Sequence, residues 1–150
     1  MSHRDRHSPD EPASLLAAEV RTAFRRLKQR LREHGGHSDL TPAQTSVVLR
    51  LEQDGPATVS SLARTEGMRP QSMSAVVAPL QELGLVRGRP DPKDLRQTLM
   101  SLTPKCARLL AEGRAARQDW LTLRISHKLS AQEQEKLRTA LSLLTRLVED

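Results

Sequence analysis

The chain has almost no aromatic side chains, because its 150 residues include one Phe, one Trp and no Tyr. Proteins that bind RNA or single-stranded nucleic acid usually stack the bases on aromatic rings, so this composition disfavours both classes. The single Cys excludes an intrachain disulfide and favours a reducing compartment. The apolar runs are too short to span a membrane, and the N-terminus lacks the apolar segment of a secretory signal. We therefore expect a cytoplasmic protein with no membrane partner.

Positive charge is what the chain has in excess. Its 24 Lys and Arg residues outnumber 18 Asp and Glu residues, which gives a formal net charge of +6. Such an excess favours polyanions, because phosphates that are neutralised by cations release their condensed counterions. Duplex DNA is read by hydrogen bonds and phosphate contacts rather than by stacking, so it fits this composition better than a single strand. The length is sufficient for one well-buried core, with or without an oligomer interface.

Both ends of the sequence have the apolar periodicity of amphipathic helices. We predict a disordered tail over residues 1–12, a helix over 13–34 that ends at Gly35-Gly36, and further helices within 104–148. The last helix opens with a capping box formed by Ser130 and Glu133. Its apolar residues share one face: Leu137, Leu141, Leu144 and Val148. A second subunit is expected to cover these faces, so 13–34 and 104–148 are the predicted dimerisation helices.

Three further helices are predicted in the middle of the sequence. Thr41 and Gln44 can form a capping box around Pro42, and the helix that follows ends near Gly55. Pro70 can begin a second helix over 70–83. A short helix lies between them, where Thr58 is a suitable cap.

A β-hairpin is predicted immediately after these helices. Its strands cover 85–89 and 97–102, and a charged segment at 91–96 joins them. Helices followed by a basic hairpin predict a winged helix-turn-helix, which places one helix in the major groove of DNA. The expected fold is mainly α with a small β-hairpin wing. It consists of a winged helix-turn-helix DNA-binding lobe at about 42–103, plus N- and C-terminal helices that form a dimerisation domain.

The hairpin also carries a spaced motif. Asp94-Leu95-Arg96 is followed, after five residues, by Leu102-Thr103. Together with the residues at 68–74 and 84–87, this spacing resembles the D-x-R-x5-L-T signature of the MarR family of transcriptional regulators. The resemblance covers the chain from about residue 13 to residue 148 and makes 13–150 a single domain of that type. Two positions depart from the family pattern: Ala75, where a basic residue is frequent, and Leu95, where many relatives carry a second arginine.

The resemblance implies a cytoplasmic homodimer that binds double-stranded DNA at a palindromic operator. Its usual action is repression, and a small anionic aromatic or amphipathic effector releases the repressor. That effector is expected beside apolar walls, between the dimerisation helices and the DNA-binding lobe. A two-fold protein matches a palindromic site whose half-sites lie about one helical turn apart. We expect no cofactor.

The residues expected to contact DNA come from three segments. The helix over 70–83 exposes polar side chains near its N-terminus, where base edges are met and free N–H groups can hold phosphate. The preceding short helix can touch the DNA backbone, and the cations of the hairpin would neutralise phosphates. These residues are Ser60, Ser61, Arg64, Arg69, Gln71, Ser72, Ser74, Arg87, Arg89, Lys93, Asp94 and Arg96.

These residues also have a simpler interpretation. They can be ordinary solvated cap and surface residues that take no part in DNA binding. Arg96 in particular has two competing roles: an ion pair with Asp94 that shapes the hairpin, or insertion into the minor groove. Asp94 is expected to organise the wing in either case.

Two features invite a sensing role. Cys106 lies in the first turn of the helix after the hairpin, where a helix N-terminus lowers the pKa of a thiol, but a small buried apolar residue is its commoner role. His34, His37 and Asp39 are three candidate metal ligands, yet nothing nearby completes a zinc site. We therefore expect no metal.

Other classes of function fit less well. The sequence has no Gly-rich phosphate loop, no Cys/His nucleophile arrangement and no carboxylate pair in an apolar setting, so we do not expect an enzyme. The alternative to a regulator is a winged-helix protein-interaction or architectural module with weak nonspecific DNA binding. Ala75 and Leu95 favour that alternative, whereas Arg69, Gln71 and Arg96 speak against it.

Overall fold

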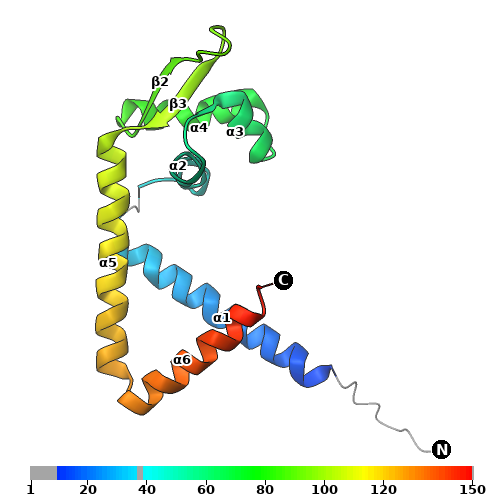
Figure 1. Cartoon of the computed structure of the whole chain (residues 1–150), viewed down its shortest axis with the longest axis vertical. Helices are drawn as coiled ribbons and strands as arrows, with labels where there is room; N and C mark the ends of the chain where they lie inside the picture. Colours follow the sequence, from blue (N-terminus) through cyan, green and yellow to red (C-terminus); the bar gives the residue numbers. More distant parts are fainter. Residues whose placement is uncertain (1–9, 37–38, 150) are drawn as a thin grey trace, which may run out of the picture. The chain divides into compact units, whose positions relative to one another are not determined.

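The computed structural model describes residues 10–36 and 39–149, which form a mainly helical chain with a small antiparallel sheet (Figure 1). This confirms the predicted fold class. Residues 1–9 of the predicted tail, and His37, lie outside the described residues. In chain order the elements are α1 (Glu11–His34), α2 (Pro42–Asp54), β1 (Ala57–Thr58), α3 (Val59–Thr65), α4 (Pro70–Glu82), β2 (Val86–Pro90), β3 (Thr98–Leu102), α5 (Pro104–Lys128) and α6 (Ala131–Arg146).

Side-chain caps set the starts of several helices. Thr41 and Gln44 form the predicted capping box of α2, in which the Gln44 N–H donates to Thr41 Oγ1 at 3.2 Å and the Thr41 N–H donates to Gln44 Oε1 at 2.9 Å. Ser130 and Glu133 form the same box at the start of α6. The prediction for α1 was wrong by two residues, because the helix already begins at Glu11. Proline in a first turn has no N–H to satisfy and has a helical φ, so Pro12 belongs to the helix rather than to a tail.

The sheet has the order β1-β3-β2 and is antiparallel throughout. The hairpin register pairs Val86 with Leu102 at one end and Pro90 with Thr98 at the other. The short strand β1, which the sequence did not predict, pairs Ala57 with Met100 on the other side of β3. This pairing holds the wing to the start of α3.

The chain divides into two compact units. We call Gly36–Ala116 the lobe, and we call the chain up to Gly35 together with the chain from Arg117 the terminal-helix unit. The helix α5 begins in the lobe and continues into the terminal-helix unit. The lobe buries a hydrophobic core from α2, α3, α4, the sheet and the start of α5. The residues of this core are Val47, Val48, Leu51, Leu62, Ala63, Met73, Val77, Leu80, Leu85, Val86, Met100, Cys106 and Leu110.

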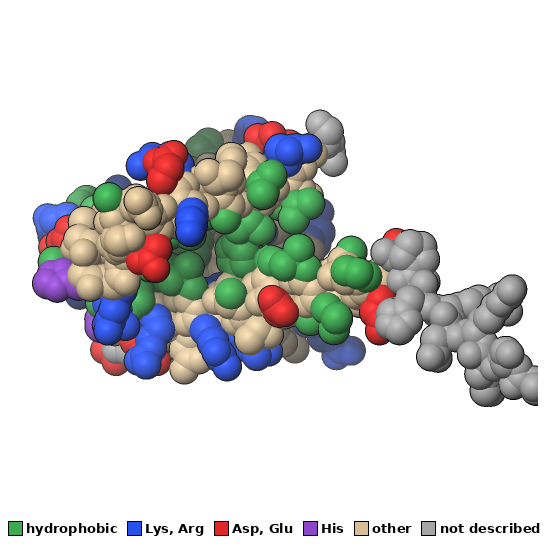
Figure 2. All heavy atoms as spheres, turned by 90° about the horizontal axis from the view of Figure 1, so that it is seen from below, with side chains coloured by type: hydrophobic (Ala, Val, Ile, Leu, Met, Phe, Trp, Pro, Cys, Tyr) green, Lys and Arg blue, Asp and Glu red, His purple; other side chains and the backbone are tan. Residues whose placement is uncertain are grey.

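The terminal-helix unit has little burial of its own. Neither α1 nor α6 contains a buried residue. Phe24 on α1 and Leu141 on α6 are 52% and 53% exposed. Figure 2 shows hydrophobic side chains gathered over the helix that leads to the N-terminus. One specific contact within the unit is the stacking of His34 on Trp120, whose ring centroids are 4.8 Å apart.

The described residues contain no helix that has both the length and the apolar character needed to cross a membrane.

Candidate nucleic-acid interface

The first turns of α4 present a polar face to solvent. Gln71, Ser72 and Ser74 are exposed there, whereas Met73 and Leu80 on the opposite side of the helix are fully buried in the core of the lobe. Their alternation follows from helical periodicity, since the buried residues recur three to four positions apart. The core therefore fixes which side chains of α4 face outward.

The start of α4 is open to a partner. Arg69 is the N-cap residue, and its side chain makes no capping hydrogen bond. Pro70 occupies the first helical position, where an N–H would have no partner within the helix. The backbone N–H groups that follow have no intrahelical acceptor, which makes this end a suitable site for a phosphate.

The short helix α3 precedes α4 and contributes the next group of predicted residues. Thr58 caps α3 by accepting a hydrogen bond from the Ser61 N–H at 3.1 Å. Ser60 and Arg64 are exposed, and Ser61 is half-buried. The described residues offer no hydrogen-bonding or ionic partner to the Arg64 guanidinium. Of the two serines, Ser60 is therefore the better placed for an outside contact.

Glu66, which the sequence analysis did not single out, holds the turn between α3 and α4 in place. Glu66 accepts a hydrogen bond from Ser46 Oγ on α2 at 2.8 Å and lies 3.5 Å from Arg50 Nη2. The chain then turns through Gly67, whose φ of +64° lies in the left-handed region. The Met68 N–H donates to the Ala63 carbonyl at 2.8 Å and closes the turn. These contacts hold the end of α3, and the turn that leads to α4, against α2.

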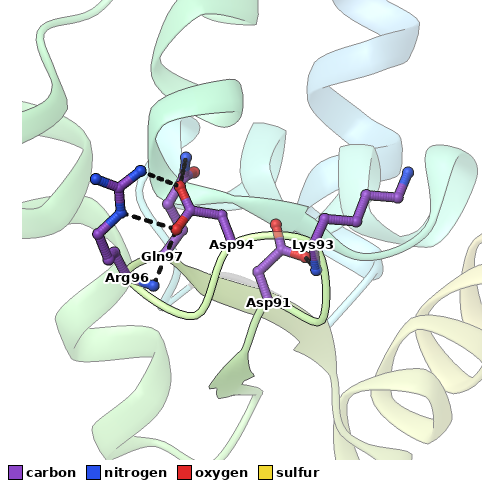
Figure 3. A network of polar contacts seen from close by, with 5 residues as sticks. All are labelled: Asp91, Lys93, Asp94, Arg96 and Gln97. Atoms are coloured by element: carbon purple, nitrogen blue, oxygen red, sulfur yellow. Dashed lines mark hydrogen bonds and ion pairs between the residues drawn. The ribbon is translucent and has the colours of Figure 1, made fainter.

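Asp94 organises the tip of the wing, as Figure 3 shows. Its carboxylate accepts hydrogen bonds from the Arg96 N–H at 3.1 Å, from Arg96 Nε at 3.0 Å, from Arg96 Nη2 at 3.3 Å and from Gln97 Nε2 at 3.4 Å. The Arg96 side chain, followed by the Arg96 backbone N–H, holds the pKa of Asp94 below its usual value. Asp91 braces the other side of the turn by accepting from the Lys93 N–H at 2.9 Å. Of the two roles considered for Arg96, the ion pair with Asp94 is the one formed here.

The remaining wing cations are free of such pairing. Arg87, Arg89 and Lys93 are exposed, and no described residue gives their charged groups a hydrogen bond or an ion pair. Across all three segments, every predicted DNA-contacting residue except the half-buried Ser61 and Asp94 is exposed. The structure brings Asp94 and Arg96 into direct contact and leaves the others, apart from the half-buried Ser61, as separate exposed groups on the lobe.

Thr103 joins the end of α4 to the start of α5. Its Oγ1 donates to the Gly84 carbonyl at 2.6 Å and accepts from the Cys106 N–H at 3.2 Å, and its N–H donates to the Leu85 carbonyl at 3.1 Å. The end of the sequence motif is therefore a structural link, a role that its spacing alone did not reveal.

A cavity of about 230 Å³ lies in the lobe beside this link. Most of its lining is apolar and comes from Leu40, Val48, Leu83, Leu85, Leu109 and Leu110. Lys105 also lines it and donates from Nζ to the Leu83 carbonyl at 2.8 Å. Asp39 lines it as well, so the apolar cavity has one cation and one carboxylate at its wall and suits a small amphipathic molecule.

The structure does not favour a sensing role for Cys106. The residue lines the cavity but is buried. Burial, followed by the negative charge of Glu52, raises the pKa of the thiol and keeps it protonated. The helix N-terminus, from which a lowered pKa was anticipated, is outweighed by desolvation. Among the described residues no cluster of His, Cys, Asp and Glu could hold a metal, while His37 is not described.

Known proteins resemble this chain over most of its length. The sequence model of the MarR family matches residues 40–98. An HTH-type transcriptional regulator of Mycobacterium bovis is 36% identical over 135 residues, which are 90% of this chain and 94% of that protein. The crystal structure of a transcriptional regulator protein from Pseudomonas aeruginosa is 30% identical, with a TM-score of 0.76 and coverage of 91% of this chain and 96% of that one.

A complex with nucleic acid is also among the similar structures. It is a mutant of MepR from Staphylococcus aureus bound to an oligodeoxyribonucleotide. It is 20% identical to this chain, with a TM-score of 0.70 and coverage of 89% of this chain and 98% of that one. At this identity the likeness shows a shared fold.

Proposed function

The chain belongs to the MarR family of helix-turn-helix transcriptional regulators, and from this premise we propose that it is a repressor that acts as a homodimer on a palindromic operator. Membership of this family makes the chain a DNA-binding regulator rather than an enzyme. In the proposed complex α4 enters the major groove, and the exposed residues of α3, α4 and the wing contact the DNA.

The observation that carries the proposal is the division of α4 into a buried face and an exposed polar face. Met73, Val77 and Leu80 anchor the helix, so Gln71 and Ser74 are held outward on a rigid support. A glutamine in this position can bond bidentately to adenine. The exposed cations Arg69, Arg87, Arg89 and Lys93 would supply the phosphate contacts, which position a protein on DNA without reading its sequence.

The terminal-helix unit supports the homodimer. Leucines on α1 and α6, such as Leu16 and Leu141, remain largely exposed in the single chain. Contiguous exposed apolar surface of this kind marks an interaction site. A second copy would bury it through a self-complementary interface and would place two lobes for two half-sites.

The cavity of the lobe supports a small-molecule effector. Its apolar lining can hold an aromatic or aliphatic body, and Lys105 can pair with a carboxylate. The Lys105 ammonium already bonds the Leu83 carbonyl near the end of α4, so an anion that captured it would loosen that bond. We propose that such a ligand releases the operator by shifting α4.

Fluorescence anisotropy of the full-length protein on the DNA that flanks its own gene, compared with scrambled DNA across a salt series, tests the proposal. We expect tight binding of two subunits per site to the flanking DNA, with an affinity that falls steeply as salt rises. Equal and weak binding to both DNAs would instead favour the interaction module.

Recognition of the DNA bases by α4 can be tested with a single substitution. Gln71→Ala should relax the preference at one base position by about 1–3 kcal/mol. Gln81→Ala is the matched control, because Gln81 is exposed near the other end of the same helix. An unchanged base preference in Gln71→Ala would remove Gln71 from the reading surface.

A further inference from the structure

A leucine stands at the tip of the wing. Leu95 is 78% exposed, which makes it the most exposed large hydrophobic side chain among the described residues of the lobe; the next, Leu83, is 49% exposed. Single exposed leucines are common on protein surfaces and need no explanation by themselves. Leu95 differs from these because its backbone is fixed and because it lies on a wing with an excess of positive charge.

Hydrogen bonds on both sides fix the backbone at Leu95. The Gln97 N–H donates to the Asp94 carbonyl at 2.9 Å, which closes a turn with Leu95 and Arg96 at its corner. The Asp94 carboxylate accepts from the Arg96 N–H at 3.1 Å across the same corner. These bonds hold Leu95 on a braced support.

The neighbouring arginine is already engaged. Arg96 uses both Nε and Nη2 on Asp94, at 3.0 Å and 3.3 Å. To enter a groove as a free cation, it would have to give up this bidentate pair. Leu95 has no polar contact to lose. Of the two residues at the corner, Leu95 is therefore the one that can insert without breaking a bond.

The charge of the wing around Leu95 favours one kind of partner for this side chain. Arg87, Arg89 and Lys93 are exposed, and no described residue pairs with their charged groups. The four Lys and Arg residues of 86–102 outnumber Asp91 and Asp94, so the wing is drawn to a polyanion rather than to an apolar protein surface. Leucine is one of the apolar side chains that proteins insert from the minor groove between base pairs, where they partly unstack a step and kink the duplex.

We propose that Leu95 is an apolar wedge that enters the minor groove at the edge of each half-site and partly unstacks a base step there. The proposal rests on the proposed function, since it presupposes operator binding. Because leucine forms no hydrogen bond, the wedge selects by deformability and favours the easily unstacked TA and CA steps. The wing then contributes sequence preference at positions that no hydrogen bond reads.

The test begins with the wild-type protein, which selects its preferred sequences from random duplexes of about 30 bp, long enough for two half-sites one turn apart with flanks. The selected duplex then carries a dye at each end, so that energy transfer reports bending. A second version carries 2-aminopurine at the step under the wing, where its fluorescence rises on unstacking. Leu95→Ala is compared with Leu49→Ala, which shortens an exposed leucine on α2.

Leu95→Ala should bind about tenfold more weakly, lower the energy transfer, abolish the rise in 2-aminopurine fluorescence and lose the preference for TA and CA at that step. The salt dependence should not change, because no cation is removed. Lys93→Ala should retain the bending of the duplex but reduce the salt dependence of binding. The slope of log affinity against log salt concentration should be smaller by about one, because one phosphate contact is lost. Leu49→Ala should behave as wild type.

Wild-type bending and fluorescence in Leu95→Ala would overturn the wedge while leaving the regulator in place. Failure of the wild-type protein to select any sequence would overturn the proposed function, and the wedge with it.

Discussion

In the lobe, α2, α3, α4 and the start of α5 bury apolar residues against one another, whereas α1 and α6 of the terminal-helix unit bury none. The ion pairs differ in the same way. Two ion pairs of the lobe join distant segments, Arg114 of α5 with Glu52 of α2 and Arg50 of α2 with Glu66, whereas the pairs found within α1 and α6, such as Arg138 with Glu135, lie three residues apart. The lobe thus has a stabilising core within one chain, whereas α1 and α6 leave large apolar side chains exposed, as the proposed homodimer requires.

The two units should respond differently to a matched pair of leucine substitutions. Leu80 is fully buried in the lobe, and Leu141 on α6 is 53% exposed. Leu80→Ala should lower the free energy of unfolding by about 2–5 kcal/mol at every protein concentration, because it leaves a cavity. Leu141→Ala should cost stability that depends on concentration, because the proposed homodimer buries this side chain between subunits. Urea unfolding followed by circular dichroism at low and high concentration measures both.

A loss in Leu141→Ala that did not vary with concentration would place that leucine in a contact within the chain. It would also remove the main support for the homodimer.

A smaller effect is expected at the link between α4 and α5. Thr103→Val keeps the shape of the side chain but leaves the Gly84 carbonyl without its hydrogen bond, so it should lower the free energy of unfolding by about 1–3 kcal/mol. Thr103→Ser keeps the hydroxyl and is the control. Thermal or urea unfolding of both variants measures the difference, and equal stabilities would show that the hydroxyl contributes nothing.

The smallest effect concerns the ion pair between Glu52 and Arg114. The hydrogen bond from Arg114 lowers the pKa of Glu52 below 4.5, so the stabilisation is complete above that pH and is lost as the pH falls through the lowered pKa. Both side chains are partly exposed, which keeps the contribution small.

Glu52→Gln should therefore be less stable than wild type near neutral pH and should approach it in acid, as followed by thermal unfolding. Glu135→Gln, which breaks a pair within α6, changes the net charge equally and should shift stability less. A constant difference between Glu52→Gln and wild type down to pH 2 would contradict the assignment.

Local patterns predicted the helices of the lobe well. The box of Thr41 with Gln44 and the prolines at Pro42 and Pro70 are short-range signals, and each marks a helix start in the structure. The same holds for the alternation of buried and exposed positions on α4. Such signals are written within a few residues, so the sequence is enough to interpret them.

Features that depend on distant partners were missed. The strand β1 is only Ala57–Thr58, and its partner Met100 lies far along the chain, so no local pattern could reveal it. Glu66 was unremarkable in the sequence, because its link to Ser46 exists only after α2 and α3 pack. For Cys106 the sequence left two roles open and favoured the small buried apolar residue; burial, which comes from the fold, confirms that role and raises the pKa of the thiol.

The parts of the D-x-R-x5-L-T motif are engaged in building the scaffold: Asp94 and Arg96 shape the wing tip, and Thr103 joins two helices. The polar face of α4 has no comparable duty in folding, because its side chains are exposed while the opposite face supplies the anchors. A lineage that duplicates this gene can therefore change Gln71, Ser72 and Ser74 with little loss of stability. If α4 reads the operator as proposed, new operators are reached by substitutions that folding does not oppose, and the same fold can serve regulators with different targets.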